Sequence, residues 1–383
     1  MNARALTSPD GRELMAALAA ERVTDENALR LSARLRARYP AALVADGLTL
    51  QRLRDRATAK FSRAQDMMLT RDGLEQASGE AVARHRAARL AGAVPVADLC
   101  CGIGGDLVAL AAHGPVLGVD RDPLHAWMAA HNAGVYGVEA RTEVADVRAV
   151  DLTGAAAVFV DPARRTERGR TRDGEPPLDW CVGLAERVSR VAVKAAPGLD
   201  RALVPPGWEA EFVAVGADLK EAVLWSPAAA EAATRATVLA DGARHTLRPA
   251  PGDEVPVDEP GEYLLDPNPA VTRAGLVAEL ARATGTWQID ERIAFLSAAN
   301  AVATPFARTL RVLDSGPWRE KDLAARLRAL DVGAVDVRRR GLAGDVDVHR
   351  KRLARALKGG TRRATLVMTR VRDRPWALVC VDA

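Results

Sequence analysis

The fold is decided by the stretch Asp98-Leu99-Cys100-Cys101-Gly102-Ile103-Gly104-Gly105-Asp106, which directly follows the apolar run 94–97. The run predicts a β-strand, and the glycines predict a turn from which a helix starts near residue 105. Glycine permits positive φ angles and lets ligand atoms approach bare backbone. A dinucleotide-binding fingerprint would need glycine at position 107, where the chain has leucine. The stretch therefore predicts a strand–turn–helix pocket for another nucleotide-like ligand. An ordinary strand–turn–helix with incidental glycines is the alternative.

Strands and helices continue to alternate beyond this turn. Strands are predicted over 94–99, 115–119, 140–144, 156–160 and 191–195, with a helix from the Asp122-Pro123 pair to about residue 136. This series predicts a parallel sheet with helices on both faces. Two further β runs, 209–215 and 220–225, are separated only by a short turn, which predicts an antiparallel strand inserted at the end of the sheet. A dinucleotide-binding sheet would be expected to finish with parallel strands.

Composition and periodicity divide the chain into three predicted regions. Residues 1–88 are rich in arginine and alanine and carry helical patterns over 26–38, 48–59 and 79–90. Residues 89–285 predict the α/β domain, with an appended hairpin over 236–248 and a helix over 270–283; residues 249–260 predict a linker or long loop between the two. Residues 303–383 predict a small α/β domain, with helices over 321–330 and 348–357 and strands over 335–339, 363–370 and 377–381.

Length and composition limit the class of protein. The 383 residues are 48% hydrophobic and 27% charged, which is typical of globular domains. No run approaches eighteen apolar residues and the first ten residues show no secretion signal, so no membrane contact and a cytoplasmic location are expected. The four cysteines include no C-x-x-C spacing, so neither a disulfide framework nor a metal site is expected. The sequence leaves the oligomeric state open.

Positive charge is concentrated at the C-terminal end. Residues 303–383 hold 19 Lys and Arg against 9 Asp and Glu, whereas the other residues hold 35 against 41. A basic domain on a mildly acidic body predicts a polyanionic partner, and RNA is the partner expected here. The candidate phosphate-binding residues are Arg338, Arg339, Arg340, Arg350, Lys351, Arg352, Arg362 and Arg363. A solvated arginine-rich surface is the alternative. Aromatic residues make up only 4% of the chain, which argues against extensive base stacking.

The acid at the end of the first strand, the G-x-G-G-D turn and the acid at Asp120 together resemble the S-adenosylmethionine pocket of class I methyltransferases. The resemblance implies that the glycines approach the methionine part, Asp98 the amino group, Asp120 the ribose hydroxyls and Asp146 the adenine. The full set of predicted cofactor-binding residues is Thr70, Asp98, Cys100, Gly102, Gly104, Asp106, Asp120, Arg121, Asp146, Val147 and Asp161. For each single aspartate, a helix cap or a solvated loop acid is the alternative.

The predicted catalytic segment follows the fourth strand and reads Asp161-Pro162-Ala163-Arg164-Arg165. Class I amino-methyltransferases carry an acid or amide, two prolines and an aromatic residue at this point. Here Asp161, Pro162 and Arg164 are the predicted catalytic residues, with Arg164 stacking on a base or holding a phosphate. A pair of surface arginines is the alternative. The charged loop 166–177 is a candidate lid. Lys194, at the end of the fifth strand, either lines the acceptor pocket or snorkels from the sheet.

Two family resemblances follow from these and neighbouring motifs. Residues 69–165 resemble the trimethylguanosine synthase-like branch of class I RNA methyltransferases, through LTRDGLE at 69–75, VARH at 82–85, the glycine turn and NAGVYGV at 132–138. In that branch the segment before the fold helps to close the cofactor pocket, which implicates the neighbourhood of Thr70. The C-terminal part resembles the THUMP-like domain of bacterial methyltransferases, through TPFARTLRVL at 304–313, RRRG at 338–341 and RATLVMTR at 363–370. The 161–165 segment departs from the first branch, which has two prolines and a tryptophan there.

These observations predict an α/β protein with a class I methyltransferase (Rossmann-like) sheet, a helical N-terminal region and a small basic THUMP-like domain. The expected activity is S-adenosylmethionine-dependent methylation of a nucleotide in structured RNA, either tRNA or rRNA. One alternative is methylation of a small molecule or protein, with the basic domain serving a structural role. Another is an RNA-binding module that binds S-adenosylmethionine but no longer transfers the methyl group.

Overall fold

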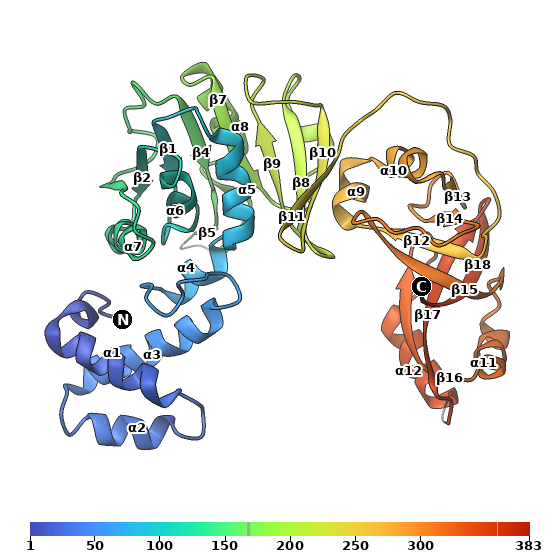
Figure 1. Cartoon of the computed structure of the whole chain (residues 1–383), viewed down its shortest axis with the longest axis horizontal. Helices are drawn as coiled ribbons and strands as arrows, with labels where there is room; N and C mark the ends of the chain where they lie inside the picture. The colour runs from blue at the N-terminus through green and yellow to red at the C-terminus, as the bar shows by residue number, and fades with distance from the viewer. Residues whose placement is uncertain (167–168, 358) are drawn as a thin grey trace. The chain divides into compact units, whose positions relative to one another are not determined.

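The computed structural model describes residues 1–166, 169–357 and 359–383, and the side chains outside 164–173 (Figure 1). The chain divides into two compact units. The first comprises Met1–Ala196, Ala202–Glu209 and Val223–Glu231, and the second comprises Pro197–Arg201, Ala210–Ala222 and Ala232–Ala383. Each unit has hydrophobic cores of its own.

The first unit begins with helices. They are α1 (Pro9–Glu21), α2 (Ala28–Leu35), α3 (Ala41–Ala57), α4 (Arg71–Gln76) and α5 (Glu80–Leu90), preceded by a short 3-10 turn over Ala5–Thr7. Helix α1 starts at Ser8, whose hydroxyl accepts from Gly11 N at 3.1 Å and caps the first turn. Gly47 lets α3 pack closely on α1, because a Cβ there would lie 3.0 Å from the Leu14 side chain. The helix predicted over 26–38 is shorter than expected at both ends.

A parallel sheet follows, as predicted. It contains β1 (Val96–Leu99), β2 (Val116–Asp120), β3 (Arg141–Val144), β4 (Ala157–Val160) and β7 (Arg190–Ala195) in the order β7-β4-β1-β2-β3, and each neighbouring pair is parallel. Helices α6 (Gly105–Ala111), α7 (Pro123–Val135) and α8 (Leu178–Gly183) belong to the same series. Strands β1 and β4 are buried along their whole length, which explains why they are nearly continuous apolar runs.

The end of the sheet has the predicted inserted strand. Strand β8 (Glu209–Val215) is followed after two residues by β9 (Asp218–Trp225), and β9 is the neighbour of β8 on one side and of β7 on the other. Neighbouring strands joined by so short a turn must run antiparallel, because a parallel connection needs a long crossover. The class I methyltransferase-type sheet expected from the sequence is therefore present.

The predicted hairpin over 236–248 is also present, as β10 (Thr234–Ala240) and β11 (Ala243–Leu247). Asp241 and Gly242 at its tip have φ of 51° and 74°, as a type I′ turn requires. Strand β10 pairs in parallel with β8.

A seven-stranded sheet forms the rest of the second unit. Its order is β13-β14-β12-β15-β18-β17-β16, with β12 (Tyr263–Pro267), β13 (Trp287–Gln288), β14 (Leu296–Ala298), β15 (Ala307–Pro317), β16 (Val332–Arg339), β17 (Arg362–Val371) and β18 (Arg374–Asp382). Helices α11 (Glu320–Ala329) and α12 (Val346–Ala356) pack on β16. The predicted boundary at residue 303 does not match this grouping, because β12, β13 and β14 precede it and belong to the same sheet.

Two local predictions differ from the structure. The single helix expected over 270–283 is two helices, α9 (Pro269–Ala274) and α10 (Val277–Thr284), because Gly275 has a φ of 73° and ends the first. The segment predicted as a loop after the fourth strand contains a two-stranded antiparallel hairpin, β5 (Ala163–Thr166) and β6 (Gly169–Glu175). Its proposed role as a lid stays a prediction.

Candidate active site

The carboxyl ends of neighbouring strands bring the predicted site residues together. Asp98 lies in β1 opposite Gly118 of β2 and Phe159 of β4. Asp120 is the last residue of β2, and Asp161 comes directly after β4. Parallel strands that end side by side deliver their last side chains to the same edge of the sheet, which is where ligands bind in this class of fold. The strand ends therefore form the candidate site.

Asp98 is a buried acid. The residue is 1% exposed, and its carboxyl Oδ2 has no hydrogen-bond partner among the described residues. Burial, followed by the nearby carboxylates of Asp106 and Asp161, raises the pKa of Asp98 well above its ordinary value. An unpaired buried carboxyl of this kind calls for a ligand that supplies a donor or a positive charge.

The glycine turn is shaped by its backbone. Cys100, Gly102 and Gly104 all have positive φ, of 64°, 53° and 87°. A Cβ at Gly104 would lie 2.9 Å from Ala129 Cα, so this glycine is required by close packing on α7. A Cβ at Gly102 would meet no described atom within 4 Å apart from its chain neighbours, so the backbone there borders open space. Burial raises the pKa of the Cys100 thiol, which keeps that thiol protonated.

Asp120 ties the turn to β2. Its Oδ2 accepts from Gly102 N at 2.8 Å, and its Oδ1 accepts from Asp122 N at 2.9 Å. Each carboxylate oxygen has a second lone pair, so both can still accept from a pair of ligand hydroxyls. Asp122 itself caps α7 by accepting from Leu124 N at 2.8 Å, in keeping with its sequence position before Pro123.

The segment before the sheet lies on the glycine turn. Thr70 caps α4 by accepting from Gly73 N at 3.0 Å, and its hydroxyl also lies 3.3 Å from His125 Nε2. A Cβ at Gly73 would collide with the Ile103 side chain, so α4 packs directly on the turn. This places Thr70 next to the turn. Its predicted role in cofactor binding stays a prediction.

Asp106 is engaged elsewhere in the core. Its Oδ1 accepts from Arg86 Nε at 3.0 Å, and both residues are buried. The Arg86 guanidinium also lies over the Phe159 ring, 5.0 Å from its centroid. The contacts shown for Asp106 join α5 to α6, and its predicted contact with the cofactor stays a prediction.

Asp161 is paired with a buried lysine. Lys194 Nζ of β7 donates to Asp161 Oδ2 at 2.6 Å, with side-chain exposures of 8% and 23%. Sequence reasoning noted Lys194 but could not pair it, because 33 residues separate it from Asp161. Pro162 follows Asp161 and precedes β5. The side chain of Arg164 lies outside the described residues.

The remaining predicted residues lie after β2 and β3. Asp146 is exposed, accepts from Arg148 N at 2.9 Å and lies 3.6 Å from the Arg148 guanidinium. Val147 is buried and Arg121 is exposed. Asp146 therefore keeps an accessible carboxylate beyond the end of β3, where an adenine ring was predicted.

The charges of the site fit the predicted methyl donor. Arg86 pairs with Asp106 and Lys194 pairs with Asp161, whereas no ion pair joins Asp98 or Asp120 to a cationic side chain among the described residues. S-adenosylmethionine carries a sulfonium and an ammonium group, and a positive charge beside these acids stabilises their ionised form. The unpaired Asp98 and the open backbone at Gly102 therefore fit this molecule.

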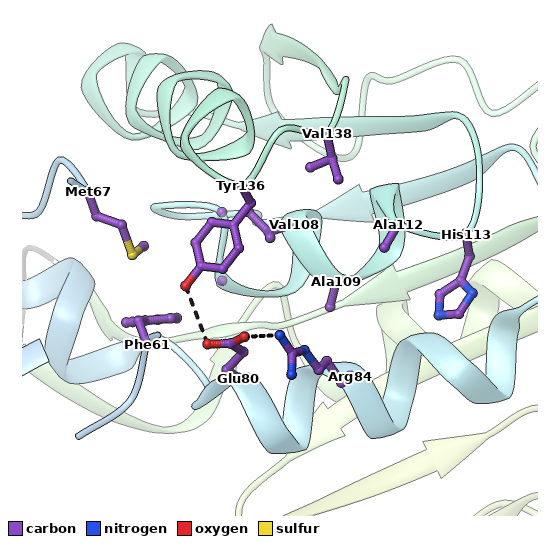
Figure 2. Close-up of a pocket in the computed structure, with 12 residues that line it drawn as sticks. Phe61, Met67, Glu80, Arg84, Val108, Ala109, Ala112, His113, Tyr136 and Val138 are labelled. Carbon is purple, nitrogen blue, oxygen red and sulfur yellow. Dashed lines mark hydrogen bonds and ion pairs between the residues drawn. The ribbon is translucent and has the colours of Figure 1, made fainter. Parts of the chain in front are cut away.

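A separate cavity of about 360 Å³ is lined in part by α5 and α6 (Figure 2). Its walls include Phe61, Met67 and Tyr136, and Glu80 at its edge accepts from the Tyr136 hydroxyl at 3.4 Å. It shares Gly104 with the glycine turn, but its lining includes none of the strand-end acids. It is therefore distinct from the candidate active site.

Many of the predicted phosphate-binding residues already have acidic partners. Arg340 pairs with Asp266 at 2.8 Å, Arg350 with Asp347 at 2.8 Å and Arg363 with Asp336 at 2.9 Å, and Arg352 pairs with Glu320. The Arg339 guanidinium donates to Gly344 O. Arg338, Lys351 and Arg362 are exposed and have no acidic partner among the described residues.

One face of α12 combines the basic residues with a hollow. Val348, Lys351, Arg352, Arg355 and Ala356 line a surface depression of about 490 Å³. These positions recur at helical spacing, so they share one side of the helix. Arg355 was not predicted, although its place four residues after Lys351 signals it. Val348, on the same side, is 51% exposed.

No described helix is long and apolar enough to span a membrane. Nor do the described residues include a cluster of three or more His, Cys, Asp or Glu side chains suited to hold a metal ion.

Three family models match parts of the chain. They are RNA cap guanine-N2 methyltransferase over 94–157, a THUMP domain-like family over 307–381 and a domain of unknown function over 2–57. A protein from Porphyromonas gingivalis, crystallised as a candidate methyltransferase, superposes with a TM-score of 0.72 over 94% of this chain and 99% of its own. At 17% identity, that likeness shows the fold alone.

Relatives in two strains of Mycobacterium tuberculosis are closer in sequence. Each is an uncharacterized S-adenosylmethionine-dependent methyltransferase, 37% identical over 340 residues that make up 83% of this chain and 90% of the relative. The sheet has the acids and the glycine turn at its strand ends, and the sequence identity extends over most of the chain. This protein therefore belongs to the S-adenosylmethionine-dependent methyltransferases.

Proposed function

We propose that this methyltransferase acts on a nucleotide in structured RNA, either tRNA or rRNA. The observation that carries the proposal is the basic face of α12, which lies inside the segment that matches the THUMP domain-like family. Lys351 and Arg355 project from that face without acidic partners in the described chain, so they are available to phosphates. The match of residues 94–157 to an RNA methyltransferase family also supports an RNA substrate.

In this proposal each strand end has one task. The backbone at Gly102 takes the methionine part, Asp98 faces its amino group and Asp120 accepts from the ribose hydroxyls. S-adenosylmethionine supplies an electrophilic methyl group. Asp161 accepts a hydrogen bond from the acceptor group and orients it in line with that methyl. Such positioning can lower the barrier by about 7–11 kcal/mol, so the site needs no strong base.

The acceptor atom is not a pyrimidine C5 in this proposal. C5 methylation needs a nucleophilic thiolate. Burial raises the pKa of Cys181 to about 12, and the residue is fully buried in α8. The segment after β4 also has Ala163 and Arg164 where the cap-methylating branch has a proline and a tryptophan, so we do not extend the proposal to cap hypermethylation.

The experiment is transfer of labelled methyl from S-adenosylmethionine to RNA, protein and small-molecule fractions from cells that lack the gene. Label in RNA that disappears with Asp161→Ala is the expected result. Label in another fraction would replace the RNA proposal with the small-molecule or protein alternative. Binding of S-adenosylmethionine with no label in any fraction would favour a binding module without transfer, which the departure at 163–164 would then explain.

A further inference from the structure

The proposal concerns the lysine at the acceptor end of the site. Lys194 comes from β7 and Asp161 follows β4, and these strands are parallel neighbours whose register places Val193 opposite Val160. The ammonium donates to Asp161 Oδ2 at 2.6 Å, and Lys194 is largely buried. The Asp161 backbone N also donates to Leu99 O at 3.1 Å. The ammonium therefore holds the carboxylate and β1 holds the backbone of Asp161, while the carboxylate Oδ1 has no described partner.

The pair changes the charge that an acceptor group meets. Asp161 alone would be a partly buried negative charge and would attract a protonated amine. With Lys194 beside it, the two charges cancel, and a cationic acceptor would meet an ammonium at close range. No ion pair joins Asp120 to a cationic side chain among the described residues, so its negative charge is left near the predicted position of the ribose.

We propose that Lys194 positions Asp161 and that the pair makes the acceptor end of the site select an uncharged acceptor group over a protonated amine. The chemical class this selects is an exocyclic amino group of a base or a hydroxyl, and the class it excludes is a lysine side chain or an aliphatic amine. The inference rests on the proposed function for the place of Asp161, and it deepens that function by favouring a nucleotide acceptor over an aliphatic amine.

The test uses two ligands that differ in charge at the transferred position. Sinefungin carries a protonated amine where S-adenosylmethionine carries its methyl group, and S-adenosylhomocysteine carries nothing there. The ratio of their affinities, measured by calorimetry at constant salt, therefore reports the charge of the acceptor end. Neither RNA nor turnover is needed, so the outcome does not depend on whether RNA proves to be the substrate.

We expect Lys194→Met to raise the affinity of sinefungin relative to S-adenosylhomocysteine about tenfold, because Asp161 is left unbalanced. Asp161→Asn should lower the same ratio, because Lys194 is left unbalanced. Lys194→Arg should restore the wild-type ratio. The matched control is Lys220→Met, since Lys220 forms an exposed pair with Asp218 at 3.4 Å and its replacement leaves the pair of Lys194 and Asp161 intact.

An unchanged ratio in Lys194→Met, with binding of S-adenosylhomocysteine retained, would overturn the proposal and leave Lys194 a packing residue. If Lys194→Met does not fold, the test rests on the affinity ratio of Asp161→Asn. The proposal is then overturned if that ratio does not decrease. Label in RNA in the transfer assay, together with an unchanged affinity ratio in Lys194→Met, would contradict this inference and leave the proposed RNA function standing. Label in a protein fraction would contradict the proposed RNA function. The affinity ratio would still test the role of the pair of Lys194 and Asp161.

Discussion

Asp120 Oδ2 accepts a hydrogen bond from the backbone N–H of Gly102 at 2.8 Å, which joins the end of β2 to the glycine turn that follows β1. The same carboxylate is the predicted partner of the ribose hydroxyls. One side chain thus shapes the turn and is in place to hold the ligand. Loss of Asp120 should therefore affect both the turn and ligand affinity.

Replacing Asp120 with alanine should weaken S-adenosylmethionine binding about tenfold to a hundredfold, because hydrogen bonds to a charged group are each worth about 1.5–3 kcal/mol. Calorimetric titration measures the change. The control is Asp122→Ala, which removes the cap of α7 and should cost about 1 kcal/mol of unfolding free energy with little effect on affinity. Equal loss of affinity in both variants would contradict the assignment of Asp120.

The two glycines of the turn should respond differently to alanine. Gly104→Ala places a Cβ 2.9 Å from Ala129 Cα at a φ of 87°, so it should lower the free energy of unfolding by about 1–3 kcal/mol or more. Gly102→Ala adds only the backbone strain, and its methyl would enter the open space expected to hold the methionine part. Thermal unfolding and ligand titration of both variants test this. Gly102→Ala should lose more affinity than stability.

Breaking the buried ion pair between Arg86 and Asp106 should destabilise the fold. Asp106→Asn removes the carboxylate that pairs with the buried Arg86 guanidinium, and breaking a buried ion pair costs about 3–5 kcal/mol in comparable cases. Denaturant titration measures the loss. If Asp106 contacts the cofactor as predicted from the sequence, the variant should also lose affinity under conditions in which it remains folded. Unchanged affinity in the folded variant would limit Asp106 to holding α5 against α6.

Asp98 should make stability depend on pH. Its pKa is raised in the folded state, so the folded protein holds this proton more tightly than the unfolded chain does. The free energy of unfolding should therefore fall as the pH rises from the ordinary aspartate value of about 3.9 towards the raised one. Asp98→Asn should remove that part of the dependence. Denaturant titrations of both proteins across this range test it, and parallel pH profiles would contradict it.

The basic face of α12 should determine how RNA affinity depends on salt. Lys351→Ala and Arg355→Ala should each reduce the slope of log affinity against log salt by about one, if each side chain neutralises one phosphate. The matched control is Arg350→Ala on the same helix, because Arg350 pairs with Asp347 at 2.8 Å. Filter binding or fluorescence anisotropy at several salt concentrations measures the slope. Similar changes in all three variants would assign the effect to net charge alone.

Sequence reasoning was most successful where the signal was local. The parallel strands, the inserted strand over 220–225 and the Asp-Gly hairpin all depend on period, turn residues and short connections, and the structure has all three. The glycine turn could be placed because positive φ needs glycine and because the strand before it is a buried apolar run.

Sequence reasoning was less successful where a strand pairs across a long distance. Strands β12, β13 and β14 join the C-terminal sheet although they precede the predicted domain, because Leu264 pairs with Leu310 and Ser297 across intervening chain. The break at Gly275 was missed because helical periodicity continues on both sides of it.

The sequence by itself determined the fold class and the methyl donor, and it predicted the strand ends as the place where that donor binds, because each depends on residue types at short spacing. Only the tertiary structure decided which charges neutralise one another. Lys194 meets Asp161, Arg86 meets Asp106, and Asp98 keeps an unpaired carboxyl oxygen among the described residues. These partners come from different strands and helices, and the distance between them depends on how the sheet is assembled. Charge balance at the site is therefore a property of the packed fold.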